Sequence, residues 1–558
     1  MDMLQTRIQK ILMRSGPFRG LVTANRGIIR NRLFLLGVCM VTINILWRLV
    51  RYTMHFPLWP DEGMVAMNFV DHGFWDIANP ARHYYVQVAP LFFWWTELAV
   101  TKIMGLSDWS LRFLPFAAGI CGMLLFYRLS TRLLPAREAL LAVAVFASSQ
   151  YPVRYATEVK PYSLDLLASV IITCLGLWLW QQRTSIRAWL AFAFACSFAL
   201  WWSFTSVFVA GGVMLALLPP VLRAGEWKWI KFWIFTGVLL TASFVLSLLV
   251  FTLPMKSGMG FLYGIWASAF PPLDRPWVIP WWLLTTHSGI LLAYPIGGHN
   301  FGSLFTLILV ITGVLVLWRR NHWKVWFLLA PAAMSLLAAF LKLYPYGASA
   351  RTNQHLAPAI CLLAGVGLMG LLKASFTAKR IPSVMIYVVA TFGAIAVFGV
   401  VDSAVRPYFT IYDALRRDAV IEVARLSKPG DIWVVANSVY PRGKSSTGYK
   451  IFSHSSLEFY FHVLAPCKVI WDQPSEASPQ PGPGATVWVL HHSCPPAYGV
   501  KPEELDTLLK SFVRRFGAPR IRRWEIDSNE RIEAFAFAAD LSMRTTRPGD
   551  QESSQTNP

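Results

Sequence analysis

The stretches LFLLGVCMVTINILW (33–47), FTLILVITGVLVLW (305–318) and MIYVVATFGAIAVFGVV (385–401) decide the class of fold. Each reaches or approaches the roughly 20 apolar residues that a helix needs to cross a bilayer. Of the 558 residues, 55% are hydrophobic and 15% are charged, whereas a soluble domain carries about 25% charged residues. The 25 tryptophans cluster beside the apolar runs, as they do at membrane interfaces. The sequence therefore predicts a polytopic α-helical membrane protein.

The apolar runs predict about eleven transmembrane helices. We place them near 32–50, 111–130, 138–153, 162–181, 188–204, 206–222, 232–253, 301–318, 325–342, 354–372 and 382–401. The net charge of +21 comes largely from Lys and Arg in short loops between these runs, and from the basic residues 1–31. Basic loops mark the cytoplasmic side of a membrane protein, so this pattern argues against nucleic acid as a partner. We expect residues 1–31 to be a cytoplasmic N-terminus and the first apolar run to be a retained signal anchor.

The opposite side of the membrane then carries the long loops. We expect residues 32–402 to form the transmembrane domain, with a long first periplasmic loop at 51–110. Within this loop, APLFFWWTELAVTKIMG (89–105) predicts an amphipathic helix on the membrane surface. The stretch 254–300 is rich in Pro and Trp, which predicts a broken, interfacial segment.

After residue 402 the composition changes to that of a soluble domain. Helical patterns occur in YDALRRDAVIEVARL, SSLEFYFHVL and PEELDTLLKSFVRRF, and strand patterns in DIWVVANS, CKVIWD, ATVWVLHHS, IRRWEID and RIEAFAFAA. Alternating strands and helices predict a small α/β domain with a mainly parallel sheet at 403–540, on the periplasmic side. Residues 541–558 are polar, and we expect a disordered tail. In an oxidising compartment Cys467 and Cys494 could pair, but their spacing leaves this open.

Two adjacent carboxylates, Asp61 and Glu62, stand in the motif LWPDEG (58–63) just after the first apolar run. A carboxylate can act as the base that removes a proton from an acceptor hydroxyl. Repulsion between neighbouring carboxylates can also raise one pKa, which suits proton transfer. The alternative is a solvated loop pair or a helix N-terminal cap.

Charged and aromatic residues also gather at the outer ends of predicted spans. The stretch YPVRYATEVKPYSLDLL (151–167) contains Arg154, Glu158, Lys160, Tyr162 and Asp165. Charges at membrane depth are costly and mark either function or a structural ion pair, and both readings stay open. The stretch KLYPYGASARTNQH (342–355) adds Tyr346, Arg351 and His355. Arginine suits phosphate oxygens, although interfacial snorkelling is the alternative.

A metal site is not indicated. In HHSC (491–494), two adjacent histidines and one cysteine are an incomplete set of ligands, and His491 and His492 point to opposite faces of a strand. We therefore expect no cofactor, although a divalent cation remains possible.

In combination, these stretches resemble the GT-C superfamily of membrane glycosyltransferases, in the group of dolichyl-phosphate-mannose:protein mannosyltransferase-like (family 39) and aminoarabinose-transferase-like proteins. The matching stretches are PDEG, HYYVQVAPLFFWW, SLRFLPFAAGICGMLLFYRLSTRLL, YATEVKPYSLDLL and YPYGASARTNQHLAPAICLLAGVGL, between about residues 30 and 375. KPGDIWVVANS is similar to the soluble domain of many bacterial members. The PPL-type loop sequence of the best-known members is replaced here by VAPLFFWW.

The resemblance implies transfer of a sugar from a polyprenyl-phosphate donor to a hydroxyl acceptor, with inversion, on the periplasmic side of a bacterial inner membrane. It assigns the catalytic base to Asp61 and the second motif position to Glu62. Lys160, Tyr162 and Arg351 would hold the donor phosphate, with Arg154, Glu158, Asp165, Tyr346 and His355 as further candidates for this site. The acceptor is a lipid, a protein or a polysaccharide. The alternatives are a transporter or lipid flippase, and a membrane scaffold that displays the C-terminal domain.

Overall fold

The computed structural model describes residues 16–85, 87–254, 264, 266–406, 411–436, 455–471, 481–493, 502–526 and 531–538. The chain divides into two compact units. The first comprises Met1–Met54, Ala89–Trp94 and Arg112–Pro407, and the second comprises His55–Val88, Trp95–Leu111 and Tyr408–Pro558. The expectations for the tail at 541–558 and for a Cys467–Cys494 pair concern residues outside the described part, since Cys494 is not described.

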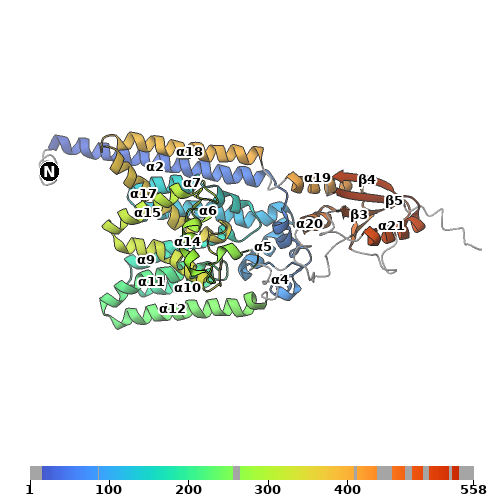
Figure 1. Cartoon of the computed structure of the whole chain (residues 1–558), viewed down its shortest axis with the longest axis horizontal. Helices are drawn as coiled ribbons and strands as arrows, with labels where there is room; N and C mark the ends of the chain where they lie inside the picture. The colour runs from blue at the N-terminus through green and yellow to red at the C-terminus, as the bar shows by residue number, and fades with distance from the viewer. Residues whose placement is uncertain are drawn as a thin grey trace, which may run out of the picture. The chain divides into compact units, whose positions relative to one another are not determined.

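The first unit is a bundle of helices (Figure 1). They are α2 (Gly16–Thr53), α7 (Ala136–Ala147), α8 (Gln150–Arg154), α9 (Tyr162–Gln181), α10 (Ile186–Ala199), α11 (Ser206–Ala224), α12 (Trp227–Ser247), α14 (Ile279–His287), α15 (Leu304–Arg320), α16 (His322–Phe340), α17 (Ala357–Ser375) and α18 (Ile381–Val405). Helices α5 (Leu91–Met104) and α6 (Asp108–Leu133) contribute residues to both units. Short segments complete it: η2 (Tyr155–Thr157), η3 (Leu248–Thr252), η5 (Ala267–Ala269), η6 (Pro276–Val278), η7 (Ile290–Leu292) and η8 (Arg351–Leu356).

Each of the eleven predicted spans overlaps a helix of the structure, and ten of them match one main helix each. Within the described residues, eight helices are long and apolar enough to cross a membrane. The helices α7, α10 and α15 have 12, 14 and 17 residues and are shorter than those eight. The polytopic helical fold is therefore confirmed, while eleven crossings remain a prediction.

One predicted span is interrupted. The sequence predicts a single helix at 138–153, but α7 ends at Ala147 and α8 begins at Gln150. The hydroxyls of Ser148 and Ser149 donate to the carbonyls of Ala144 and Val145, both at 2.7 Å. Such local bonds compete with helix continuation, which explains the break.

Helix α17 is the most buried of the eight candidate spans. It packs on α15, where a Cβ at Gly367 would lie 1.8 Å from the carbonyl oxygen of Leu309, and a Cβ at Gly313 would lie 2.0 Å from that of Leu363. Small residues at these positions let the two backbones approach closely, as in other membrane helices. Conversely, only 22% of the apolar window of α12, and likewise of α18, is buried inside the protein. Lipid is the environment that accommodates such apolar outer faces.

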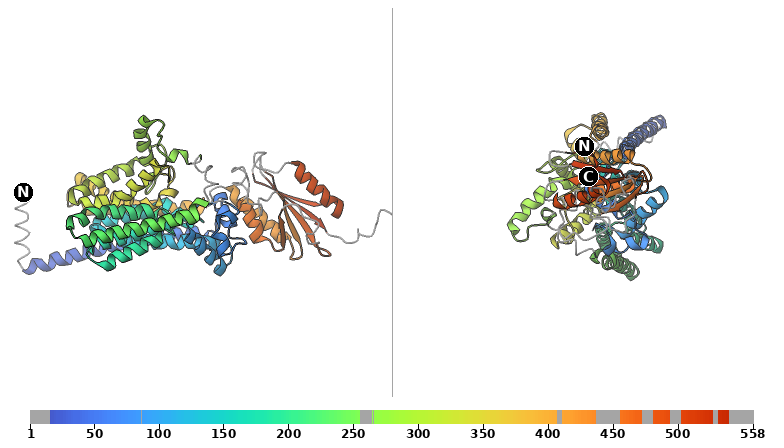
Figure 2. Two further views of the ribbon diagram at one scale, coloured as in Figure 1. Left: turned by 90° about the horizontal axis from the view of Figure 1, so that it is seen from below. Right: turned by 90° about the vertical axis from the view of Figure 1, so that its right-hand side faces the viewer.

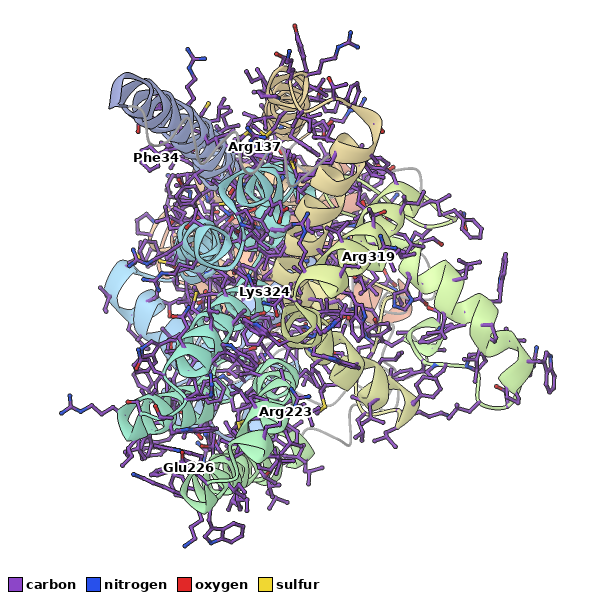
Figure 3. All side chains as sticks on the ribbon, turned by 90° about the vertical axis from the view of Figure 1, so that its left-hand side faces the viewer. Phe34, Arg137, Arg223, Glu226, Arg319 and Lys324 are labelled. Carbon is purple, nitrogen blue, oxygen red and sulfur yellow. The ribbon has the colours of Figure 1, made fainter. Side chains whose placement is uncertain are left out.

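Basic loop residues gather at one end of this bundle. Figure 3 looks onto that end, across which Arg137, Arg223, Arg319 and Lys324 are distributed, with the acidic Glu226 near Arg223. Nearby, the buried Glu138 on α7 pairs with Arg320 on α15 at 2.5 Å. The gathering agrees with the predicted charge asymmetry of the loops, and its assignment to the cytoplasmic side remains a prediction.

The second unit combines the first long loop with the C-terminal domain. Its other elements are α3 (Pro60–Met67), α4 (Phe74–Ile77), η1 (Pro80–Arg82), α19 (Ile411–Leu426), α20 (Ser455–Leu464), α21 (Pro502–Phe516), β1 (Ile432–Ala436), β2 (Lys468–Trp471), β3 (Thr486–Ser493), β4 (Arg520–Glu525) and β5 (Arg531–Ala538). All three helices and five strands predicted after residue 402 are confirmed.

The five-stranded sheet has the order β2-β1-β3-β5-β4. Pairing is parallel from β2 through β1 to β3 and antiparallel from β3 through β5 to β4. The sheet is therefore mixed, and the expectation of a mainly parallel sheet is wrong for β4 and β5. Consecutive strands that are close in sequence pair antiparallel, since a parallel pair needs a long crossover. Residues Val434, Val489 and Phe537 pack against α21, and the ring of Trp433 on the other face contacts Phe461 of α20. Figure 2 shows helices on both faces of the sheet.

Candidate active site

The two carboxylates of the LWPDEG motif begin helix α3 in the second unit. Pro60 occupies the first helical position, where its missing N–H is no loss. Asp61 is 9% exposed and Glu62 is 1% exposed, so the pair is not a solvated loop. The Glu62 carboxylate accepts a hydrogen bond from the backbone N–H of Trp59 at 3.4 Å. Glu62 therefore caps the helix, and the partial positive charge of the helix N-terminus favours both carboxylates.

The glycine of the motif is required by a close approach of another helix. A Cβ on Gly63 would lie 2.3 Å from the backbone nitrogen of Ser456, in the first turn of α20. In the same place the hydroxyl of Ser455 donates to the carbonyl of Pro60 at 2.6 Å. The motif is thus closed by a helix from the C-terminal part of the chain. No local pattern in the sequence signals this contact, because almost 400 residues separate the partners.

In the first unit, Arg154 and Glu158 form an ion pair with Nε and Oε1 2.7 Å apart. Burial works to lower the pKa of Arg154, but the charge and hydrogen bond of Glu158 outweigh it and the pKa is raised. Tyr155 lies beside the pair, with Cζ of Arg154 5.9 Å from its ring centre. Burial and then the Glu158 charge raise the pKa of Tyr155, so its hydroxyl stays protonated and can donate a hydrogen bond.

Tyr162 and Arg351 approach the same tyrosine. The rings of Tyr155 and Tyr162 are 5.4 Å apart, edge to face. The charge of Arg351 lies close enough to act on the pKa of Tyr155 in the lowering direction. Cζ of Arg351 stands 4.9 Å from the ring centre of Trp266, a cation–π contact. We call Arg154, Tyr155, Glu158, Tyr162 and Arg351 the Tyr155 cluster.

Lys160 is 5% exposed and lies between Glu158 and Tyr162 in the chain. Its backbone N–H donates to the carbonyl of Glu158 at 2.8 Å, in a tight turn. Lysine is rarely buried to this extent, which makes this position unusual.

The structure places three further predicted residues outside the Tyr155 cluster. The Asp165 carboxylate accepts a hydrogen bond from the hydroxyl of Ser203 at 2.6 Å. His355 Nε2 lies 2.8 Å from the hydroxyl of Ser335. The Tyr346 hydroxyl lies 3.1 Å from Nε2 of His287. These contacts tie helices and loops together inside the first unit.

Sequence reasoning missed several residues that the structure places near buried charges. Tyr155 and Trp266 complete the surroundings of the predicted arginines, and their aromatic character near basic residues was the available signal. Glu97 on α5 is fully buried, and burial raises its pKa well above the usual range. Arg48 on α2 is fully buried and donates from Nη2 to the carbonyl of Pro152 at 3.2 Å.

Chemically, the second unit offers a carboxylate pair fixed at a helix start. The first unit offers guanidinium groups and tyrosine hydroxyls, which suit the oxygens of a phosphate. Within the described ranges, no three His, Cys, Asp or Glu residues come together as a metal site would require.

Part of the chain matches a family model, and most of it is similar in fold to solved structures. Residues 87–251 match the family model described as dolichyl-phosphate-mannose-protein mannosyltransferase. The crystal structure of ArnT from Cupriavidus metallidurans bound to undecaprenyl phosphate is similar over 89% of this chain and 97% of that chain, with a TM-score of 0.51 and 15% identity. The crystal structure of the same protein in the apo state has a TM-score of 0.50 and 14% identity, and it covers 89% of this chain and 97% of that chain. No protein with a curated description is significantly similar in sequence.

At this identity the structural likeness concerns the fold alone. Together with the family-model match, it confirms the predicted resemblance to the GT-C membrane glycosyltransferases.

Proposed function

We propose that this protein is an inverting membrane glycosyltransferase that moves a sugar from a polyprenyl-phosphate donor to a hydroxyl acceptor. The observation that carries the proposal is the carboxylate pair Asp61–Glu62, fixed at the start of α3 with Glu62 engaged as a helix cap. Asp61 is the first acidic residue of the motif, the position to which the resemblance assigns the base, and the start of a helix favours its ionised form. The likeness to an ArnT structure that holds undecaprenyl phosphate supports the lipid-linked donor.

In the proposed reaction, the Asp61 carboxylate takes the proton of the acceptor hydroxyl. The acceptor oxygen forms a bond to the anomeric carbon while the bond from that carbon to the phosphate oxygen breaks. Polyprenyl phosphate leaves with the bonding electron pair, and the single displacement inverts the anomeric configuration. Arg154, Lys160 and Arg351 stabilise the charge that develops on the leaving phosphate, and Tyr155 or Tyr162 donates a hydrogen bond to it.

We further propose that Asp61 and the domain at 403–540 face the periplasm of a bacterial inner membrane. The basic loops that gather at one end of the bundle support this orientation. A reporter fused after Asp402 that is active only in the cytoplasm would contradict it. A transporter or flippase explains the spans, but it gives no role to the fixed carboxylate pair.

The test of the function is single-turnover transfer from a lipid-linked sugar. Asp61→Asn keeps the shape but cannot take a proton, and it should slow transfer by about 10²–10⁴-fold with donor binding unchanged. Glu62→Gln should slow it less, because glutamine can still cap the helix. Asp71→Asn is the matched control, since Asp71 is an exposed carboxylate of the same loop. Near-normal transfer by Asp61→Asn would remove the base assignment.

A further inference from the structure

Helix α20 is packed into the second unit as a buried support for α3. Its residues 455–461 are all buried. Its first turn touches the α3 backbone so closely that position 63 admits only glycine. A side chain at this position would push the two helices apart. The relation of α20 to the Asp61 helix is therefore fixed by backbone contact.

Tyr460 on α20 ties down the chain just before α3. Its hydroxyl accepts a hydrogen bond from the backbone N–H of Leu58 at 2.6 Å. The same hydroxyl donates to Oδ2 of Asp108 at 2.9 Å. Oδ2 of Asp108 also lies 3.6 Å from Nη1 of Arg417. The same Nη1 donates a hydrogen bond to the carbonyl of His55 at 2.6 Å. Tyr460 is only 1% exposed, so its hydroxyl accepts one hydrogen bond and donates another where water is excluded.

The residue that ends α3 is connected to α20 as well. Asn68, the C-cap of α3, donates from its side chain to the carbonyl of Tyr85 at 2.9 Å. Tyr85 in turn donates from its hydroxyl to Oε2 of Glu458 at 2.6 Å. Leu58 and Asn68 thus flank the helix that carries Asp61, and both are connected to one turn of α20, at Glu458 and Tyr460.

We propose that α20 sets the position of the Asp61 carboxylate, with Tyr460 and Glu458 as positioning residues for transfer. This inference rests on the proposed role of Asp61. The C-terminal domain is then a working part of the enzyme, because the base of the first loop depends on hydrogen bonds from a helix almost 400 residues later. A displacement of about 1 Å at a reacting group can slow an enzyme by about 10²-fold.

The experiment compares the full-length parent with Tyr460→Phe, which keeps the ring but loses both hydrogen bonds. The transfer rate constant kcat should fall about 10–100-fold. The KM for the lipid-linked donor should stay within about twofold, because the proposed phosphate-binding residues belong to the other unit. Tyr412→Phe is the matched control, since Tyr412 is exposed on α19 of the same unit. An unchanged kcat in Tyr460→Phe, or an equal loss in the control, would overturn the proposal.

Amide hydrogen exchange of peptides covering residues 58–68 gives a readout that needs no activity. These amides should exchange about tenfold faster in Tyr460→Phe than in Tyr412→Phe, and unchanged exchange would contradict the positioning role. If the parent transfers no sugar, the proposed function fails. The exchange measurement still shows whether Tyr460 holds residues 58–68 in place. If Tyr460→Phe does not fold, Glu458→Gln takes its place, because it keeps the shape and weakens the hydrogen bond from Tyr85. The same two outcomes then apply to Glu458→Gln, with a smaller expected decrease in kcat.

Discussion

Nε of Arg154 lies 2.7 Å from Oε1 of Glu158, four residues later in the chain. The pair fixes the segment between α8 and α9, and its carboxylate partly neutralises a cation proposed to face the donor phosphate. Glu158→Gln keeps a hydrogen-bond acceptor for Arg154 but removes this negative charge. We expect the proposed polyprenyl phosphate to bind about threefold to tenfold more tightly and to leave more slowly. Equilibrium binding of the lipid measures this, with the exposed Asp274→Asn as control. Weaker binding would mean that the pair serves structure alone.

Arg351 should be sensitive to shape as well as to charge. Its guanidinium lies over the Trp266 ring, and the compact ammonium of lysine does not reproduce the broad face of a guanidinium. Arg351→Ala should weaken donor binding by about tenfold or more, and Arg351→Lys should fall between Ala and the parent. Lys160→Ala should have an effect similar to that of Arg351→Ala. If donor affinity is unchanged in both alanine variants while the protein still inserts, the phosphate lies elsewhere.

Arg48 and Arg51 on α2 should respond in opposite ways to replacement by methionine. The side chain of Arg48 is fully buried, and among the described residues its Nε and Nη1 have no hydrogen-bond partner. Arg51 bonds through Nε to Thr157 at 3.0 Å and through Nη1 to Ser403 at 3.3 Å. A buried, poorly compensated charge is often replaced by an apolar group without loss of stability. Thermal unfolding in detergent should therefore show Arg48→Met as at least as stable as the parent, and Arg51→Met as less stable.

The stability of the C-terminal domain should fall in acid through Glu533. The neighbouring His491 ring, with Arg531 and Arg523, holds the pKa of Glu533 below its usual range, although burial opposes this. The folded state then binds the proton less readily than the unfolded state. The stabilisation is fully present above the unfolded pKa of about 4.3 and is lost as pH falls through the lowered folded pKa.

Glu533→Gln should lower the resistance of this domain to protease at neutral pH and flatten its dependence on pH below about 5. The control is Glu525→Gln, which removes an exposed carboxylate from the neighbouring strand. If the Glu533 variant loses protease resistance in acid as steeply as the parent does, then groups other than Glu533 cause that loss.

Local sequence determined the elements of this protein. Apolar runs of bilayer length produced the helices, because a buried or lipid-facing backbone must satisfy its own hydrogen bonds. Period-two patterns produced the strands after residue 402, and their alternation with helices produced the α/β domain. The break at Ser148 and the antiparallel β4–β5 edge escaped this reasoning. The break depends on hydrogen bonds of the Ser148 and Ser149 hydroxyls, which a hydropathy pattern does not report. The antiparallel edge depends on which strands pair, which a local pattern does not encode.

Sequence also determined the chemical types available for a site: the Asp61–Glu62 pair and the basic, aromatic ends of the spans. Only the tertiary structure decided which of them meet. It joined Arg154 and Arg351 around Tyr155, and it assigned Asp165, His355 and Tyr346 to contacts within the bundle. It also set α20 against the PDEG helix through Gly63. The approach of Arg154 to Arg351 and of Gly63 to α20 joins residues about 200 to 400 positions apart. A sequence pattern encodes only near neighbours, whereas long-range packing selects among many compatible partners.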